Sequence, residues 1–217
     1  FSEKPCKGGV AIKGNKILAS GPDAVIKKYI GTNTEILEYS DSFIMPGFID
    51  AHVHYFSGAI LGSKYVCRDI ENSTSEMDCV ERIKKFAETH PDEKRIIGFG
   101  WFPAKWGDAP LPTKHSLDEA ISDRPVYLLC ADVHTMWLNT KALEESGISK
   151  DMHPESGKIG VDSSGELNGL LFEPDAFKPA MEKVMDFEKE KMIQIHKDFL
   201  SYLASNGVTA ISDMTGD

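Results

Sequence analysis

A nearly continuous apolar run, FIMPGFIDAHVH over residues 43–54, sets the first limit on the fold. A strand with one solvated face alternates apolar and polar residues. A strand that is covered on both faces of a parallel sheet is apolar along most of its length. The run therefore predicts a buried parallel strand that ends at His54.

Helix and strand signals alternate after this run, which is typical of the α/β class with a parallel sheet. Gly147 and Gly207 mark the ends of two of the helices. A capping box, Ser116-Leu117-Asp118-Glu119, is expected to open another, short helix. The longer predicted helices are 75–89, 139–146 and 187–206, the predicted strands are 95–100, 125–131 and 208–214, and a hairpin is predicted over 157–171.

Residues 1–42 have a different pattern, with short strands joined by glycine turns. Strands are predicted at 9–13 and 16–20 around a Gly14-Asn15 turn, followed by a short helix at 23–29 and a strand at 36–39. A segment of this size buries too little surface to close a core alone. We therefore expect two domains: 1–42 as part of a small, composite β-sandwich, and 43–217.

Charge and composition narrow the range of partners. The formal net charge is −10, and such an acidic chain repels phosphate backbones, so nucleic acid is not an expected partner. No apolar run reaches the length of a membrane span. The 4 cysteines form no C-x-x-C pair, which is typical of reduced thiols in a cytoplasmic protein, although a disulfide stays open.

His52 and His54 are candidate metal ligands. Residues i and i+2 of a strand point to the same side, so the two imidazoles can converge on one ion or on a close pair of ions. Asp50 shares that side and could orient a ligand. The pair also ends a predicted parallel strand, which is where α/β barrels place their active sites. The alternative is two histidines that pack at a strand end without a metal.

Two long motifs resemble a known family. FIMPGFIDAHVH is similar to the first barrel strand of the amidohydrolase superfamily, in which a Pro-Gly-hydrophobic-hydrophobic-Asp-x-His-x-His motif supplies two metal ligands. Residues 98–148 resemble the amidohydrolase-3 branch of N-substituted formamide deformylase-like enzymes. The chain departs in having Val133 where glycine is usual, and Arg124 in Asp-Arg-Pro. The positions that it keeps are Gly100-Trp101, Trp106, Pro112-Thr113, Leu117-Asp118, Pro125-Val126, His134, Trp137, Asn139 and Ala142-Leu143.

The resemblance implies the N-terminal portion of a (β/α)₈ barrel over residues 43–217. Such a barrel takes about 250 residues, so the sequence reads as incomplete at both ends, with roughly three barrel strands present. It also implies a site for one or two divalent ions, with zinc expected, in which Glu173 is the carboxylate that bridges two ions. The alternative for Glu173 is a surface residue at a helix start.

The resemblance gives two further kinds of site residue. His134 would polarise a substrate carbonyl or line the pocket, and Trp101 and Trp106 would wall an apolar substrate pocket. The alternatives are a histidine that bonds a backbone group and tryptophans that belong to the core.

The implied function is a metal-dependent hydrolase that cleaves carbon–nitrogen bonds of small amide or formamide-like substrates through a metal-activated water. Later ligands would come from later strands, so this chain alone is expected to be inactive. Two alternatives stay open. One is an amidohydrolase-like binding or assembly protein with a decayed site, and the other is a metal-free α/β protein whose His-x-His pair is incidental. A homo-oligomer is also left open.

Overall fold

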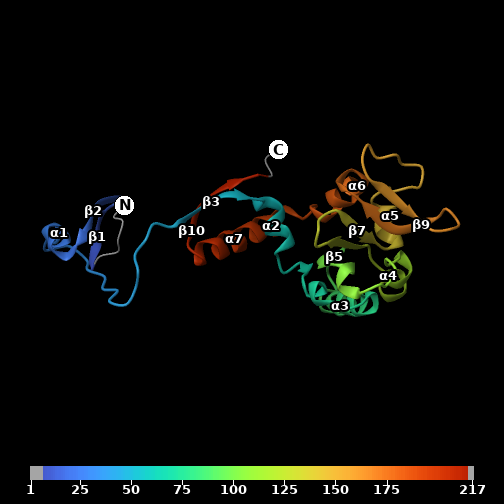
Figure 1. The fold of residues 1–217 in the computed structure, drawn as a ribbon, viewed down its shortest axis with the longest axis horizontal. Coiled ribbons are helices and arrows are strands. Elements are labelled where there is room, and N and C mark those ends of the chain that lie inside the picture. The colour runs from blue at the N-terminus through green and yellow to red at the C-terminus, as the bar shows by residue number, and fades with distance from the viewer. Residues whose placement is uncertain (1–6, 215–217) are drawn as a thin grey trace. The chain divides into compact units, whose positions relative to one another are not determined.

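The computed structural model describes residues 7–214, and the chain divides into two compact units between Phe48 and Ile49 (Figure 1). In the first unit, β1 (Gly8–Lys13) and β2 (Lys16–Pro22) form an antiparallel hairpin, and α1 (Asp23–Ile26) and the 3₁₀ turn η1 (Lys27–Tyr29) follow. The hairpin is as predicted. The predicted strand at 36–39 is wrong: these residues form no strand, because the described part of the unit offers them no third strand to pair with.

In the second unit, β3 (Phe48–Val53) pairs with β10 (Val208–Asp213) in a two-stranded sheet. Helices α2 (Tyr55–Leu61) and α7 (Lys189–Ser205) pack against each other through Ile60 and Ile195. The expectation that β3 is buried on both faces is wrong here, since Ile49 is 74% exposed. Among the described residues only β10 lies beside this strand, so its apolar side chains stay uncovered.

A separate six-stranded sheet has the order β4-β5-β6-β7-β9-β8. The expectation of a parallel sheet is confirmed only for β4, β5 and β6. The antiparallel β8–β9 pair is the hairpin predicted over 157–171, whereas the antiparallel pairing of β7 with β6 and β9 is a correction. Only four residues join β6 to β7, too few for the crossover that a parallel pair needs. The strands are β4 (Val66–Cys67), β5 (Ile96–Trp101), β6 (Val126–Cys130), β7 (Thr135–Leu138), β8 (Lys158–Val161) and β9 (Leu167–Phe172).

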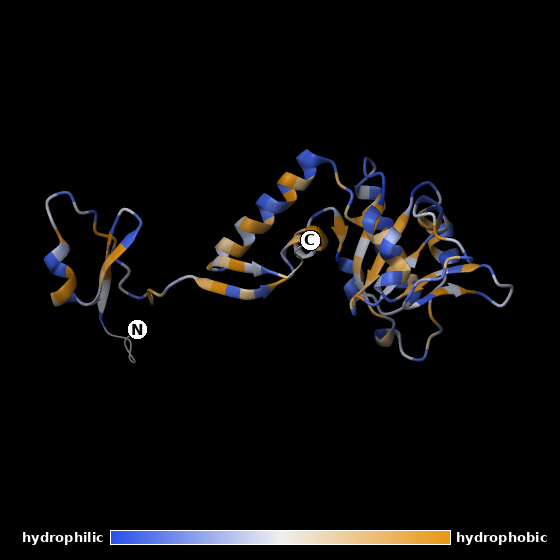
Figure 2. Cartoon of the chain, turned by 90° about the horizontal axis from the view of Figure 1, so that it is seen from above, coloured by the Kyte–Doolittle hydropathy of each residue, from blue (hydrophilic) through white to orange (hydrophobic). Residues whose placement is uncertain are grey.

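Strands β5 and β6 pair with each other in this second sheet and not with β3. Side chains alternate along β6, so Leu128 joins one apolar cluster and Tyr127 the other. The first cluster includes α3 (Glu76–Thr89) and α4 (Lys114–Ala120), and the second includes α5 (Thr140–Glu145) and α6 (Pro174–Val184). Two 3₁₀ turns, η2 (Asp69–Asn72) and η3 (Pro103–Trp106), complete the unit. Figure 2 shows the apolar strands of this sheet between the more polar outer faces of its helices.

The expected capping box does not open α4. This helix starts at Lys114, with Thr113 as the preceding residue, so Ser116 lies inside the first turns. Its hydroxyl instead bonds Glu76 at the start of α3 and the carbonyl of Thr113. Ser75, by contrast, caps α3 by accepting the amide hydrogen of Asp78.

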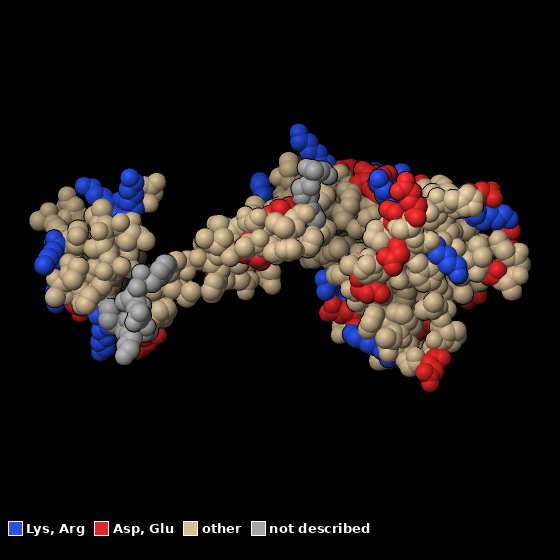
Figure 3. All heavy atoms as spheres, turned by 45° about the horizontal axis from the view of Figure 1, so that its top comes forward, with Lys and Arg blue, Asp and Glu red and all other residues tan. Residues whose placement is uncertain are grey.

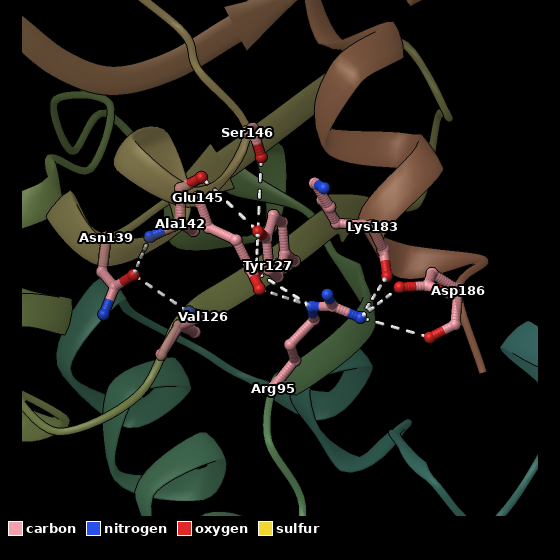
Figure 4. Close-up of polar contacts among 9 residues, drawn as sticks. All are labelled: Arg95, Val126, Tyr127, Asn139, Ala142, Glu145, Ser146, Lys183 and Asp186. Atoms are coloured by element: carbon pink, nitrogen blue, oxygen red, sulfur yellow. Dashed lines mark hydrogen bonds and ion pairs between the residues drawn. The ribbon is translucent and has the colours of Figure 1, made fainter. Parts of the chain in front are cut away.

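Polar side-chain contacts tie the six-stranded sheet to its helices (Figure 4). Arg95 Nε donates to both carboxylate oxygens of Glu145, at 3.0 and 2.9 Å, and its Nη1 donates to the carbonyls of Lys183 and Asp186. Tyr127 donates its hydroxyl to Glu145 at 2.6 Å. Burial raises the pKa of Tyr127, and the bond to Glu145 raises it further. Arg95 thus fixes the end of α6 to α5 and the sheet.

The described cysteines Cys67, Cys79 and Cys130 are buried and unpaired, and burial raises the pKa of Cys79 and Cys130 to about 12. Cys6 lies outside the described residues. No helix in residues 7–214 has the length and apolar character of a membrane span. Over the second unit, acidic and basic side chains stand side by side on the face shown in Figure 3.

Candidate functional site

The predicted metal-ligand pair lies where β3 ends. The rings of His52 and His54 are 5.6 Å apart between centroids and nearly perpendicular, at 72°. Asp50 accepts the backbone amide of His52 at 3.1 Å, so its printed contact is with the backbone and not with an imidazole. Asp50 therefore braces the backbone of the β3 end that carries the histidines. The arrangement leaves two neighbouring imidazoles exposed at one strand end.

The end of β10 is hydrogen-bonded to the residues on either side of His54. Asp213 Oδ1 accepts the amide hydrogen of Tyr55 at 2.9 Å, and Val53 accepts the amide hydrogen of Met214 at 2.8 Å. Burial raises the pKa of Tyr55, and the charge of Asp213 adds to the effect. These contacts hold the residues that follow the two histidines against the neighbouring strand.

His134 and Glu173 form a second polar pair, at the adjoining ends of β7 and β9. His134 Nδ1 lies 2.7 Å from Glu173 Oε2, and the amide of Glu173 donates to the carbonyl of His134, also at 2.7 Å. Asp132 Oδ1 accepts the amide of His134 at 2.8 Å. The bond from Glu173 and its charge raise the pKa of His134. Two hydrogen bonds thus join the same two residues.

Sequence reasoning missed the role of Asp132, although a signal was present. Asp50-x-His52 and Asp132-x-His134 share one pattern, and in both the aspartate accepts the amide hydrogen of the histidine two residues later. At Asp132 this is the local bond by which an Asp side chain stabilises a turn, whereas Asp50 makes it within strand β3. The repeated Asp-x-His pattern predicts a fixed backbone at each candidate histidine.

Backbone strain gathers at the second pair. In the described residues, the non-glycine positions with positive φ are Val133, at 58°, and Glu173, at 69°. Glu173 combines this φ with a ψ of 151°, a region that is essentially restricted to glycine. Such conformations cost about 1–3 kcal/mol each. The side chains of His134 and Glu173 are 59% and 48% exposed, and water screens an ion pair this open, so it offsets little of that cost.

Replacing Val133 with glycine is expected to stabilise the chain. Glycine adopts positive φ without a Cβ clash, and Val133 is 47% exposed, so little burial is lost. We expect the free energy of unfolding to rise by about 1 kcal/mol, measured by urea denaturation. Val161→Gly is the matched control, since this exposed valine lies in strand β8, and it should lower stability. An unchanged or lower stability for Val133→Gly would contradict the assigned strain.

The tryptophans predicted to wall a pocket lie in the core. Trp101 has 0% exposure and donates Nε1 to the carbonyl of Leu128. Trp106 is also buried and donates to the carbonyl of Ser73. Trp137 completes the group, with ring centroids 5.6 and 6.5 Å from the other two. The core alternative for these indoles is the one that the structure shows, because their surfaces already contact protein.

The described residues do not complete a metal centre. No three His, Cys, Asp or Glu side chains in residues 7–214 are close enough together to hold an ion. Glu173, predicted as a bridge, is not brought to His52 and His54 and bonds His134 instead. The two imidazoles fit a zinc ion by donor type, as two of the four ligands that such an ion takes. The remaining ligands are not supplied by the described part of the chain.

A cavity of about 300 Å³ lies apart from these residues. Several of its charged side chains are paired: Lys191 bonds both carboxylate oxygens of Glu93 at 2.8 Å, and Lys94 bonds Glu188 at 3.0 Å. A cavity in which most charged groups already have a partner offers little to a charged ligand. We therefore assign no site to it.

A family model of the amidohydrolase family, Amidohydro_3, matches residues 40–217. The chain belongs to this amidohydrolase family. Its relatives within and around the family include "Protein LONG AFTER FAR-RED 3" of Arabidopsis thaliana, 31% identical over 98% of this chain and 36% of that protein. "Putative amidohydrolase YtcJ" of Bacillus subtilis is 32% identical over 68% of this chain and 27% of its own length. "N-substituted formamide deformylase" of Arthrobacter pascens is 25% identical over 96% and 39%.

The fold of this amidohydrolase chain also matches a solved structure. An uncharacterized metal-dependent hydrolase from Pyrococcus horikoshii OT3 superposes with a TM-score of 0.67 at 23% identity, over 94% of this chain and 38% of that one. The chain thus spans less than half the length of the relatives that it matches. The likeness extends over both units described above, so the mixed six-stranded sheet is part of the shared fold.

Proposed function

We propose that this chain is part of a metal-dependent hydrolase that cleaves a carbon–nitrogen bond in a small amide-type substrate. The observation that carries the proposal is the His52–His54 pair, with both rings exposed at the end of β3 in a chain of the amidohydrolase family. The relative named as a formamide deformylase supports the amide class of substrate. Pairing of β3 with β10 supports these as neighbouring strands of a barrel that the rest of the protein would close.

In this proposal His52 and His54 hold one or two divalent ions, with zinc the expected metal because imidazole is one of its usual ligands. When bound, such an ion lowers the pKa of a water and supplies hydroxide at neutral pH. Asp50 and Asp213 fix the backbone on either side of the two histidines, so that the imidazoles keep their separation.

Elemental analysis of the full-length protein tests this function. The unaltered protein is expected to carry one or two equivalents of zinc, and His52→Ala/His54→Ala is expected to lose it, because no other described histidine pair lies at this strand end. His115→Ala/His153→Ala is the matched control, since both side chains are exposed and outside the site, and it should keep the metal.

Two results would redirect the assignment. Zinc that survives the His52→Ala/His54→Ala change would place the metal elsewhere. No metal in the unaltered protein, after growth with added zinc, would favour an amidohydrolase-like binding or assembly protein with a decayed site.

A further inference from the structure

We propose that the second unit contains a hinge about which its six-stranded sheet rotates as one body. Residues 66–184, from β4 to the end of α6, are called the sheet part, and residues 49–61 with 189–214 are called the histidine part. The chain passes between the two parts at 62–65 and at 185–188. The inference does not rest on the proposed function, because it concerns motion and not metal.

Each part has a core of its own. The sheet part holds the two large apolar clusters, whereas the core of the histidine part is formed by Ala59, Ile60 and Ile195. The helices gather accordingly in Figure 1, with α2 and α7 at β3 and β10, and with α3 to α6 around the other sheet. Arg95 donates to the carbonyl of Asp186, so the rigid sheet part extends into the second crossing.

The two crossings lie side by side, as a single axis of rotation requires. The rings of Tyr65 and Phe187, one from each crossing, are 6.0 Å apart between centroids. Neither crossing is helix or strand. Leu61, at the end of α2, joins the second core cluster of the sheet part, and Phe187 packs against both that cluster and the one around Ile60. These apolar contacts lie at the crossings, where a rotation displaces atoms least.

An ion pair joins the two parts beyond the crossings. Lys191 in α7 bonds both carboxylate oxygens of Glu93 at 2.8 Å, and the two side chains are 31% and 17% exposed. A second pair, Lys94 with Glu188, is largely exposed and contributes little. The cavity of about 300 Å³ lies among these residues, so the surfaces are not closely packed there. Two cores joined by a small polar contact are expected to move relative to each other.

The hinge matters for function because the candidate residues lie on both sides of it. His52 and His54 belong to the histidine part, and His134 belongs to the sheet part. Rotation would therefore change the separation between these residues. The ion pair of Lys191 and Glu93 would hold the arrangement that the structure shows, and salt would weaken this hold, because dissolved ions screen a partly exposed pair.

Distances between spin labels in the full-length protein test the hinge. One label replaces Glu119 in α4 and the other replaces Lys197 in α7, so that each part carries one label at an exposed position. The control pair is Glu119 with Lys141 in α5, since both positions lie in the sheet part. Each label is attached to a noncanonical amino acid, so that no cysteine is modified.

Loss of the ion pair is expected to populate a second distance between labels 119 and 197. At low salt, Glu93→Gln should raise the population of this displaced arrangement about 5-fold. Sodium chloride at about 1 M should produce the same shift in the unaltered protein and little further change in Glu93→Gln. Glu144→Gln is the matched control, because this glutamate is exposed in α5, and it should leave the distances unchanged. The distance between labels 119 and 141 should stay constant throughout.

Three results would overturn the inference. One is a single, unchanged distance between labels 119 and 197 in Glu93→Gln and at high salt. Another is an equal spread of distances for labels 119 and 141, because the sheet part would then loosen and not rotate. The third is a Lys191→Gln variant that behaves as the unaltered protein, although it removes the other charge. The salt series needs no substitution, so it tests the hinge even if a variant fails to fold. Zinc content is measured separately, so the proposed function stands or fails independently.

Discussion

Asn139→Ala is expected to lower the free energy of unfolding by about 4 kcal/mol. The side chain is fully buried and makes four hydrogen bonds. Its Oδ1 accepts the amides of Val126 and Ala142, both at 2.9 Å (Figure 4). Its Nδ2 donates to the carbonyls of Ile121 and Arg124. Alanine would leave four backbone groups without a partner in a space that water does not reach. An unsatisfied buried group costs about 1–3 kcal/mol, and partial relaxation reduces the sum.

Tryptophan fluorescence during urea denaturation measures this effect. All 3 tryptophans lie in the first core cluster, so their emission follows the six-stranded sheet that Asn139 supports. Asn72→Ala is the matched control, because this asparagine is exposed and has one long side-chain contact, at 3.4 Å to Asp69. It should change stability by less than about 0.5 kcal/mol. A similar small change for Asn139→Ala would contradict the network.

Trp101→Ala is the second large effect, with an expected loss of about 4 kcal/mol. The substitution leaves a cavity between Trp106 and Trp137, whose rings lie 5.7 and 5.6 Å from that of Trp101, and it removes the donor to Leu128. The two remaining tryptophans report the transition. Trp101→Phe should lose about half as much, because the ring stays and the indole donor goes.

The Trp101 series also decides between core and pocket. Leu111→Ala, at a side chain that is 48% exposed, is the control and should be nearly neutral. If Trp101→Ala kept full stability and altered only the binding of an amide-type substrate, the indole would belong to a pocket. We expect the reverse, because the side chain shows no surface to solvent.

Local signals in the sequence predicted the elements better than their pairing. The apolar spacing in 75–89 and 187–206 predicted α3 and α7, and Gly14 with Asn15 predicted the β1–β2 hairpin. The order of the strands was not predictable in the same way. The strand order depends on contacts between segments that are distant in the sequence. The one local clue was the short link from β6 to β7, which permits only antiparallel pairing of these two strands.

The candidate site shows the same difference between features set by one segment and features set by strand pairing. His52 and His54 were found because their spacing is a property of one strand. The bond between His134 and Glu173 joins positions 39 residues apart and depends on the pairing of β7 with β9. The strained φ of Val133 had a clue, since glycine is usual there in the amidohydrolase-3 branch. Glu173 had no such clue, because only a glycine in the sequence would have indicated this backbone conformation.

The connection between the two ends of the second unit has a consequence for how the chain folds. Tyr55 and Asp213, which bond where β3 and β10 end, are 158 residues apart. Closing so long a loop has an entropic cost, whereas β5, β6, β7, β8 and β9 pair with strands much nearer in sequence. During synthesis, β10 also leaves the ribosome long after β3. We therefore expect the six-stranded sheet to form first and to bring the two distant strands together, so that the His52–His54 strand acquires its neighbour late in folding.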